Sequence, residues 1–296
     1  MRKIEFWETL GDSYRFVFAD VMRFVRLAGA WIALCAAVAI ALGLYAHFAP
    51  MPGNRMTLVG VRSALLLPLA AIGLVRFVGL TAFAVSWHRS ILLADVPRGF
   101  NFRFGRRELR YFSYGWGLMA TVAMVLAVLA FAAGTILGLL LGISGLIESA
   151  PHPAIRALTF AIPALAGMII FIAIGLRIVL GLPAIAVDEP RGVLRRGWDR
   201  SRGNAWRLFF ASLLCLLPME MIGGAVNSVA PMILRHPGPG WTAARIAALA
   251  IGTILFYFLL FLGDAVWVAF LSNAYRQLVA ATPEAEASVL GAALAA

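Results

Sequence analysis

Six apolar runs, each long enough to cross a lipid bilayer, constrain the fold of this chain more than any other feature. A helix needs about 20 apolar residues to span a hydrocarbon core of about 30 Å, and in lipid its backbone must satisfy its own hydrogen bonds. Hydrophobic residues make up 62% of the chain and charged residues only 13%, which excludes an ordinary water-soluble domain. The sequence therefore predicts an all-α polytopic membrane protein with six transmembrane helices, near 28–49, 63–87, 112–142, 157–187, 207–233 and 242–273.

The distribution of basic residues predicts the orientation of these helices. Of the 25 basic residues, 18 lie in the N-terminal segment, the 88–111 and 188–207 connections and the C-terminal end, and 5 lie on the opposite side. Because positive charge is retained in cytoplasmic connections, both termini are expected in the cytoplasm. The net charge of +11 has the same cause, so no nucleic-acid partner is expected. The first residues lack the pattern of a removable signal peptide.

Three parts of the chain are distinguished by composition. Residues 1–27 alternate apolar and basic side chains at helical spacing, which predicts an interfacial amphipathic helix on the membrane surface. The six-span domain is expected over 28–276, and a flexible tail of low complexity over 277–296. The apolar face expected to lie on the membrane consists of Tyr14, Val17, Phe18, Val21, Met22 and Val25.

A short recurrence links the two basic connections. The segments DVPRG (95–99) and DEPRG (188–192) each precede a run of arginines. Since Asp caps helix N-termini and Pro is tolerated in a first turn, each copy predicts the start of an Arg-rich cytoplasmic connecting helix. The recurrence also suggests a three-fold parallel repeat of two-helix units. A chance match of five residues is the alternative.

Four formal charges fall inside the expected spans, each roughly 17–20 Å from the cytoplasmic edge at 1.5 Å per residue. Charges at such depth require partners, so we expect two arginines and two acids to form one neutral cluster, which a nearby amide could line. Ion pairs that only fix helix register are one interpretation. A polar cavity that binds an anionic group or relays protons is the other. The residues are Arg76, Arg177, Glu220, Asp264 and Asn227.

The arginines of the two connections, with neighbouring tryptophans, are expected to contact the lipid headgroups of an anionic cytoplasmic leaflet. General anchoring and a specific lipid site are both compatible with this pattern. The residues are Arg98, Arg103, Arg106, Arg107, Arg191, Arg195, Arg196, Arg200, Arg202, Trp198 and Trp206.

Small residues four apart in the third run let helices approach closely, which predicts a packing face within the chain or between subunits. No metalloprotease, serine-hydrolase, Walker or dinucleotide-binding motif is present. The four histidines lack metal-ligand spacing and are expected near solvent or the interface. The sequence therefore predicts no catalytic residue, metal or cofactor. The packing face consists of Ala130, Gly134, Gly138 and Gly142.

Residues 195–209, RRGWDRSRGNAWRLF, resemble a motif in uncharacterised six-helix bacterial inner-membrane proteins related to the membrane region of glycerophosphodiester phosphodiesterases. In those enzymes the chemistry belongs to an attached soluble domain, so the resemblance implies location in a bacterial inner membrane and not an activity. The matching positions are Trp198, Ser201, Arg202, Gly203, Asn204, Trp206, Arg207 and Leu208.

Together these patterns predict a non-enzymatic inner-membrane protein that handles or transports a small anionic solute or a lipid headgroup through the charged cluster. Its expected partners are membrane lipids and either a second copy or a larger membrane complex. The alternative is an accessory or assembly subunit whose ion pairs are purely structural. An intramembrane enzyme that uses Glu220 or Asp264 is a third interpretation, with no motif to support it.

Overall fold

The computed structural model describes residues 3–48, 58–96, 99–143, 153–189, 192–235 and 243–279, and every regular element in these ranges is helical. Within these ranges, five helices are long and apolar enough to cross a membrane, as expected for an all-α multi-pass protein. The elements are α1 (Phe6–Ala19), α2 (Val21–Phe48), α3 (Leu58–Leu92), α4 (Arg106–Phe112), the π-helix η1 (Ser113–Gly117), α5 (Leu118–Ile143), α6 (Pro153–Ile178), α7 (Gly181–Ala186), α8 (Val193–Arg200), α9 (Ala205–Arg235) and α10 (Ala243–Val279).

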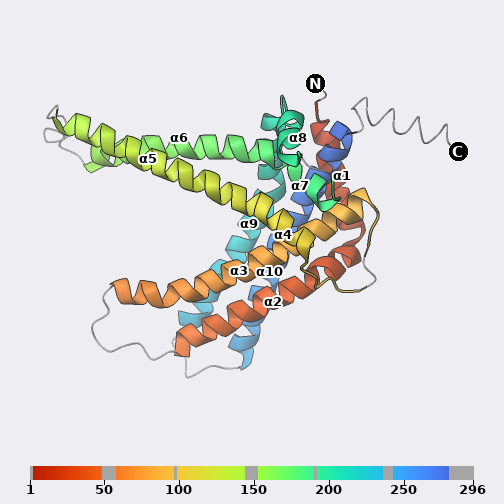
Figure 1. The fold of residues 1–296 in the computed structure, drawn as a ribbon. Helices are drawn as coiled ribbons and strands as arrows, with labels where there is room; N and C mark the ends of the chain where they lie inside the picture. Colours follow the sequence, from red (N-terminus) through yellow and green to blue (C-terminus); the bar gives the residue numbers. More distant parts are fainter. Residues whose placement is uncertain are drawn as a thin grey trace.

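Three helix hairpins, α2–α3, α5–α6 and α9–α10, diverge from one end of the molecule (Figure 1). We call this the arginine end; it comprises α1, α4, α7, α8 and the adjoining ends of the long helices. Helix α10 is central, since it packs against α9, α1, α2 and α3, whereas α5 and α6 pack chiefly against each other. The hairpins match the expected two-helix units in number, and the repeat itself stays a prediction.

An aromatic core joins α2, α3 and α10 near the arginine end. Trp87 is fully buried, and its indole Nε1–H donates a 3.0 Å hydrogen bond to the Ala265 carbonyl oxygen of α10. The rings of Phe16, Phe24 and Phe83 surround it with centroid distances of 5.4–6.2 Å. These contacts fix the relative positions of the helices that carry the charged residues described below.

The expected fourth span, 157–187, is not one continuous helix. Helix α6 ends at Ile178 and α7 begins at Gly181. Pro183 has no N–H to donate to the Val179 carbonyl oxygen, which instead accepts the Leu182 N–H at 3.0 Å in a tight turn. The described apolar part of α6, Leu165–Ile178, is shorter than the five spans above. A sixth span therefore remains a prediction, but its expected extension to 187 is wrong.

The N-terminal region differs from the single interfacial helix expected over residues 1–27. Helix α1 ends at Ala19 and packs against α10, and Asp20 caps α2 by accepting the Arg23 N–H at 2.9 Å. This break divides the expected apolar face, because Val17 is fully buried while Phe18 and Met22 are exposed. A location at the membrane interface stays a prediction for α1.

The recurrent aspartates do not cap the Arg-rich helices. Helix α8 begins after Gly192, and α4 begins after Gly105, whose N–H is accepted by the Glu108 carboxylate at 2.8 Å. Asp188 instead closes α7: its φ is +59°, its N–H bonds to Ile185, and the next N–H bonds to Ala184. This is a helix C-terminal motif, which leaves the Asp188 side chain available for other partners.

Of the predicted packing face on α5, Gly134 is buried, whereas the surroundings of Ala130, Gly138 and Gly142 lie outside what the structure describes.

Candidate functional site

The structure brings together three of the four charges expected inside the spans. Arg76 of α3 and Glu220 of α9 form an ion pair with 3.5 Å between guanidinium Nη2 and carboxylate Oε1, and their side chains are 35% and 50% exposed. Asp264 of α10 lies close enough to act electrostatically on both. The three residues lie 15 or 16 positions from the arginine-end limits of their spans, or about 22–24 Å. Counted along their helices, the three residues therefore lie at similar distances from the arginine end.

Arg177 is not part of this cluster. It lies in the last turn of α6, with its guanidinium carbon 4.8 Å from the centre of the Trp198 ring of α8. In the described ranges no carboxylate pairs with it. The position follows from the break after α6, which places Arg177 at a helix end instead of mid-span. The expected cluster of two cations and two anions therefore has one cation and two anions.

One carboxylate oxygen of Asp264 has no hydrogen-bond partner in the described part of the chain. This oxygen, Oδ2, is buried. Asn227, two turns beyond Glu220 on α9, has an exposed side chain. The arrangement offers a carboxyl group with one unpartnered oxygen and a single cation nearby.

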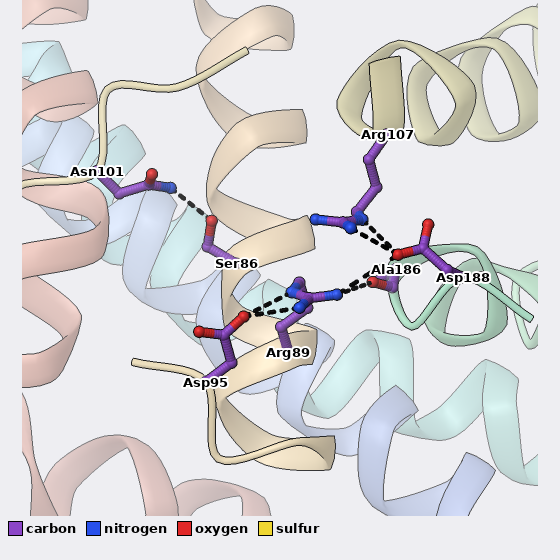
Figure 2. Close-up of polar contacts among 7 residues, drawn as sticks. All are labelled: Ser86, Arg89, Asp95, Asn101, Arg107, Ala186 and Asp188. Atoms are coloured by element: carbon purple, nitrogen blue, oxygen red, sulfur yellow. Dashed lines mark hydrogen bonds and ion pairs between the residues drawn. The ribbon is translucent and has the colours of Figure 1, made fainter. Parts of the chain in front are cut away.

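A second charged group, which sequence reasoning missed, lies at the arginine end (Figure 2). Arg89 of α3 donates to the Asp95 carboxylate at 2.7 and 2.9 Å and to the Ala186 carbonyl at 3.3 Å, and contacts Asp188 at 3.6 Å. Arg107 of α4 donates to the same oxygen of Asp188, Oδ2, at 2.6 and 2.9 Å. The aspartates of the two recurrent segments thus converge on Arg89.

The hydrogen bond from Arg107 holds the pKa of the Asp188 carboxyl below its usual range, so this group stays ionised near neutral pH. Its position at the end of α7 directs the carboxylate toward both arginines, as Figure 2 shows. The network joins α3 and α4 to α7, which lies far from both in the sequence.

Next to this network lies a pocket of about 570 Å³ between the end of α3, the start of α4 and the 99–105 segment. Asn101 fixes that segment: its N–H bonds to the Arg26 carbonyl and its amide donates to the Ser86 hydroxyl. Phe100 forms an aromatic wall and is 69% exposed. The polar lining includes two carboxylates as well as three arginines: Ser86, Arg89, Asp95, Asn101, Arg103, Arg107 and Glu108.

The other predicted headgroup residues are divided between ion pairs and the surface. Arg196 and Arg200 contact Glu189 at 3.2 and 3.6 Å, and Arg195 and Arg202 contact Asp199 at 4.0 and 3.5 Å. Arg98 and Arg191 lie outside the described residues. Side chains that are exposed at this end include Arg103, Arg106 and Trp206.

His88, expected near solvent or the interface, is fully buried between α10 and α4, so that expectation is wrong. Its Nδ1 lies 2.7 Å from the Ser272 hydroxyl and its Nε2 lies 3.1 Å from the Tyr111 hydroxyl. Ser272 donates its one hydroxyl hydrogen to the Val268 carbonyl at 2.9 Å. With the Ser272 hydroxyl donating to Val268, the imidazole carries its hydrogen on Nδ1 and accepts from Tyr111 at Nε2.

The segment that carries the family resemblance forms the joint between α8 and α9. Gly203 has a φ of +76°, a conformation that favours glycine. Asn204 is fully buried, and its side-chain oxygen accepts the Ile4 N–H at 3.0 Å. Comparison with protein-family models, curated proteins and solved structures finds no match. The resemblance therefore stays a prediction.

Proposed function

We propose that this protein binds the phosphate group of an anionic lipid headgroup, without covalent chemistry, in the pocket at the arginine end. The observation that carries the proposal is the lining of that pocket, where three guanidinium groups meet an exposed aromatic wall. Arginine pairs with phosphate through two parallel N–H donors, and an aromatic side chain at headgroup level suits the adjoining acyl region.

The formal charges around the pocket cancel, because three arginines (Arg89, Arg103 and Arg107) face three carboxylates (Asp95, Glu108 and Asp188), so an anion would be held by unpaired guanidinium donors. Asp95 and Asp188 neutralise Arg89 and Arg107. The Glu108 carboxylate is bound to a backbone N–H at the start of α4. Within the described part of the chain, Arg103 pairs with no carboxylate, so its guanidinium donors are available to a phosphate. By contrast, the deeper cluster has more acids than cations, which argues against the anion site expected there.

The depth of the pocket also suits a headgroup. Arg89 lies three residues before the end of the α3 span, Ala70–Leu92. Under this proposal the arginine end faces the cytoplasm, the protein lies in a bacterial inner membrane, and its ligand comes from the anionic leaflet.

Retention of lipid by the purified protein tests the proposal. Protein in mild detergent is incubated with equal amounts of phosphatidylglycerol and phosphatidylcholine, and bound lipid is counted by native mass spectrometry. Wild type should retain phosphatidylglycerol preferentially. Arg103→Gln should lower retention about five-fold, corresponding to about 1 kcal/mol for one basic residue.

The matched control is Arg195→Gln, the same change on α8 at a side chain that is 92% exposed and outside the pocket. It should leave retention unchanged. Equal retention of the two lipids by wild type, or equal losses in the two variants, would count against a specific site.

The accessory-subunit alternative draws support from a different observation. Helices α5 and α6 project from the other hairpins (Figure 1) and pack chiefly against each other. Large apolar side chains on them, such as Phe131, are exposed. A partner helix could cover this surface as lipid would. Elution of the native protein with a defined larger complex, lost on substitution of Phe131 by Asn, would favour that alternative.

A further inference from the structure

The charged cluster within the spans has an uncompensated negative charge if all its groups are ionised. Arg76 supplies one positive charge, while Glu220 and Asp264 supply two negative charges. Arg177, the cation expected to balance them, lies instead on Trp198. An isolated charge is strongly disfavoured at this depth, so the cluster requires either a neutral carboxyl group or a bound cation.

The geometry identifies which carboxyl is neutral. Glu220 is half-exposed and in ion-pair contact with Arg76. Asp264 makes no ion pair in the described ranges, and its Oδ2 is buried without a hydrogen-bond donor. A buried carboxylate oxygen without donors is a costly arrangement, whereas a carboxylic acid in the same position has no net charge to compensate.

We propose that Asp264 is a proton-binding site in the membrane-spanning part of the protein, with its proton bound while Arg76 pairs with Glu220. Release of the proton to the solvent leaves a second carboxylate beside Arg76, whose single guanidinium then serves both acids. Proton binding at Asp264 and the choice of partner by Arg76 are thereby coupled across α3, α9 and α10.

Among the residues that the structure describes, the surroundings of Asp264 supply no other cation. Arg76 of α3 and Glu220 of α9 act on it directly, and Tyr111 of α4 lies within electrostatic range. Cys35 of α2 and Tyr257 of α10 lie near Arg76. Helix α7 has no titratable side chain, and α1 contacts α10 through residues such as Ser13 and Gln277 at the arginine end.

Labelling with a carbodiimide tests this site. Dicyclohexylcarbodiimide is apolar and adds as a whole molecule to a protonated carboxyl group, giving a stable N-acylurea with no leaving group. The full-length protein in phosphatidylcholine liposomes is treated at a series of pH values, and the peptide that contains Asp264 is analysed by mass spectrometry. We expect one adduct on Asp264, in decreasing yield as the pH rises, and little labelling by a water-soluble carbodiimide.

The variant Glu220→Gln provides a more specific test of the site than the pH series of the wild type. This change removes the competing acid, so Arg76 becomes available to Asp264 and favours its ionised form. Labelling of Asp264 at a given pH should therefore fall several-fold. The control Asp12→Asn removes an exposed carboxylate of α1 that pairs with Arg15, and should have no effect.

Two results would overturn the proposal: no adduct on Asp264 at any pH, or labelling that Glu220→Gln leaves unchanged in a folded protein. The wild-type pH series needs no substitution, so it decides the first point even where a variant fails to fold. Arg103→Gln should not change the labelling, which separates this site from the proposed lipid pocket.

Discussion

Replacement of His88 by Phe probes whether its two hydrogen bonds hold α4 and α10 against α3. The imidazole is fully buried, and Phe keeps a planar ring, larger by one ring atom, without either ring nitrogen. Ser272 keeps a partner, since it already donates to the Val268 carbonyl. The Tyr111 hydroxyl loses its acceptor and has no other partner within the described residues.

The expected loss of stability follows from this difference between the Ser272 and Tyr111 hydroxyl groups. A buried hydroxyl without a partner costs about 1–3 kcal/mol, whereas removal of both members of a pair is nearly neutral. Interhelical hydrogen bonds in membrane proteins average about 0.6 kcal/mol, with a maximum near 1.7. Because His88 and Tyr111 are both buried, we expect His88→Phe to destabilise the protein by about 1–2 kcal/mol. Addition of Tyr111→Phe should restore about 1 kcal/mol of that loss.

Unfolding by sodium dodecyl sulfate in mixed micelles, followed by tryptophan fluorescence, measures these free energies for wild type, the two single variants and the double variant. A coupling energy near zero would refute the reasoning, because it would mean that the two side chains contribute independently. A neutral His88→Phe would refute it as well.

Two further predictions concern the arginine end. Because the folded-state pKa of Asp188 is held low by Arg107, the contribution of this pair to stability is present at neutral pH and is lost as the pH falls through that value. Wild type should therefore lose about 0.2–1 kcal/mol more than Asp188→Asn between pH 6 and pH 3 in the same unfolding assay, the small figure reflecting the exposure of the pair. Gly181→Ala places a Cβ atom against the Tyr114 hydroxyl and should destabilise the protein by about 1–3 kcal/mol. Gly224→Ala on α9, where a Cβ meets nothing, should be neutral or stabilising, and a similar loss in both variants would exclude the steric explanation.

The sequence-based prediction of the charged cluster failed at one residue, Arg177, because of a break in one helix. The proximity of Arg76, Glu220 and Asp264 agrees with their similar distances along the helices, because helical rise converts a number of residues into a length. The placement of Arg177 failed because it assumed an unbroken helix through Pro183. A proline near the end of an apolar run is compatible with a kink or with a break, and only the contacts of the following segment decide between them.

The charged network of Arg89 could not be found from sequence for a different reason. Asp188 lies 81 residues from Arg107, and Ala186 lies 97 residues from Arg89. The recurrent Asp-x-Pro-Arg-Gly pattern contains both acids, but capping rules interpret it as two helix starts and not as two acids that share one arginine. Local capping rules describe a residue's neighbours in the chain and contain no information on distant partners.

The sequence by itself determined the class of this protein, because apolar runs of this length must form helices that satisfy their own backbone hydrogen bonds in lipid. It also determined which residues would need partners, since charge within such runs is strongly disfavoured. Only the tertiary structure decided which groups those partners are. Arg76 pairs with Glu220 and not with Asp264, Arg177 lies on a tryptophan ring, and His88 contacts two hydroxyl groups. Pairing depends on how hairpins from distant parts of the chain rotate and pack, and hydropathy fixes the depth of a side chain but not the direction in which it points.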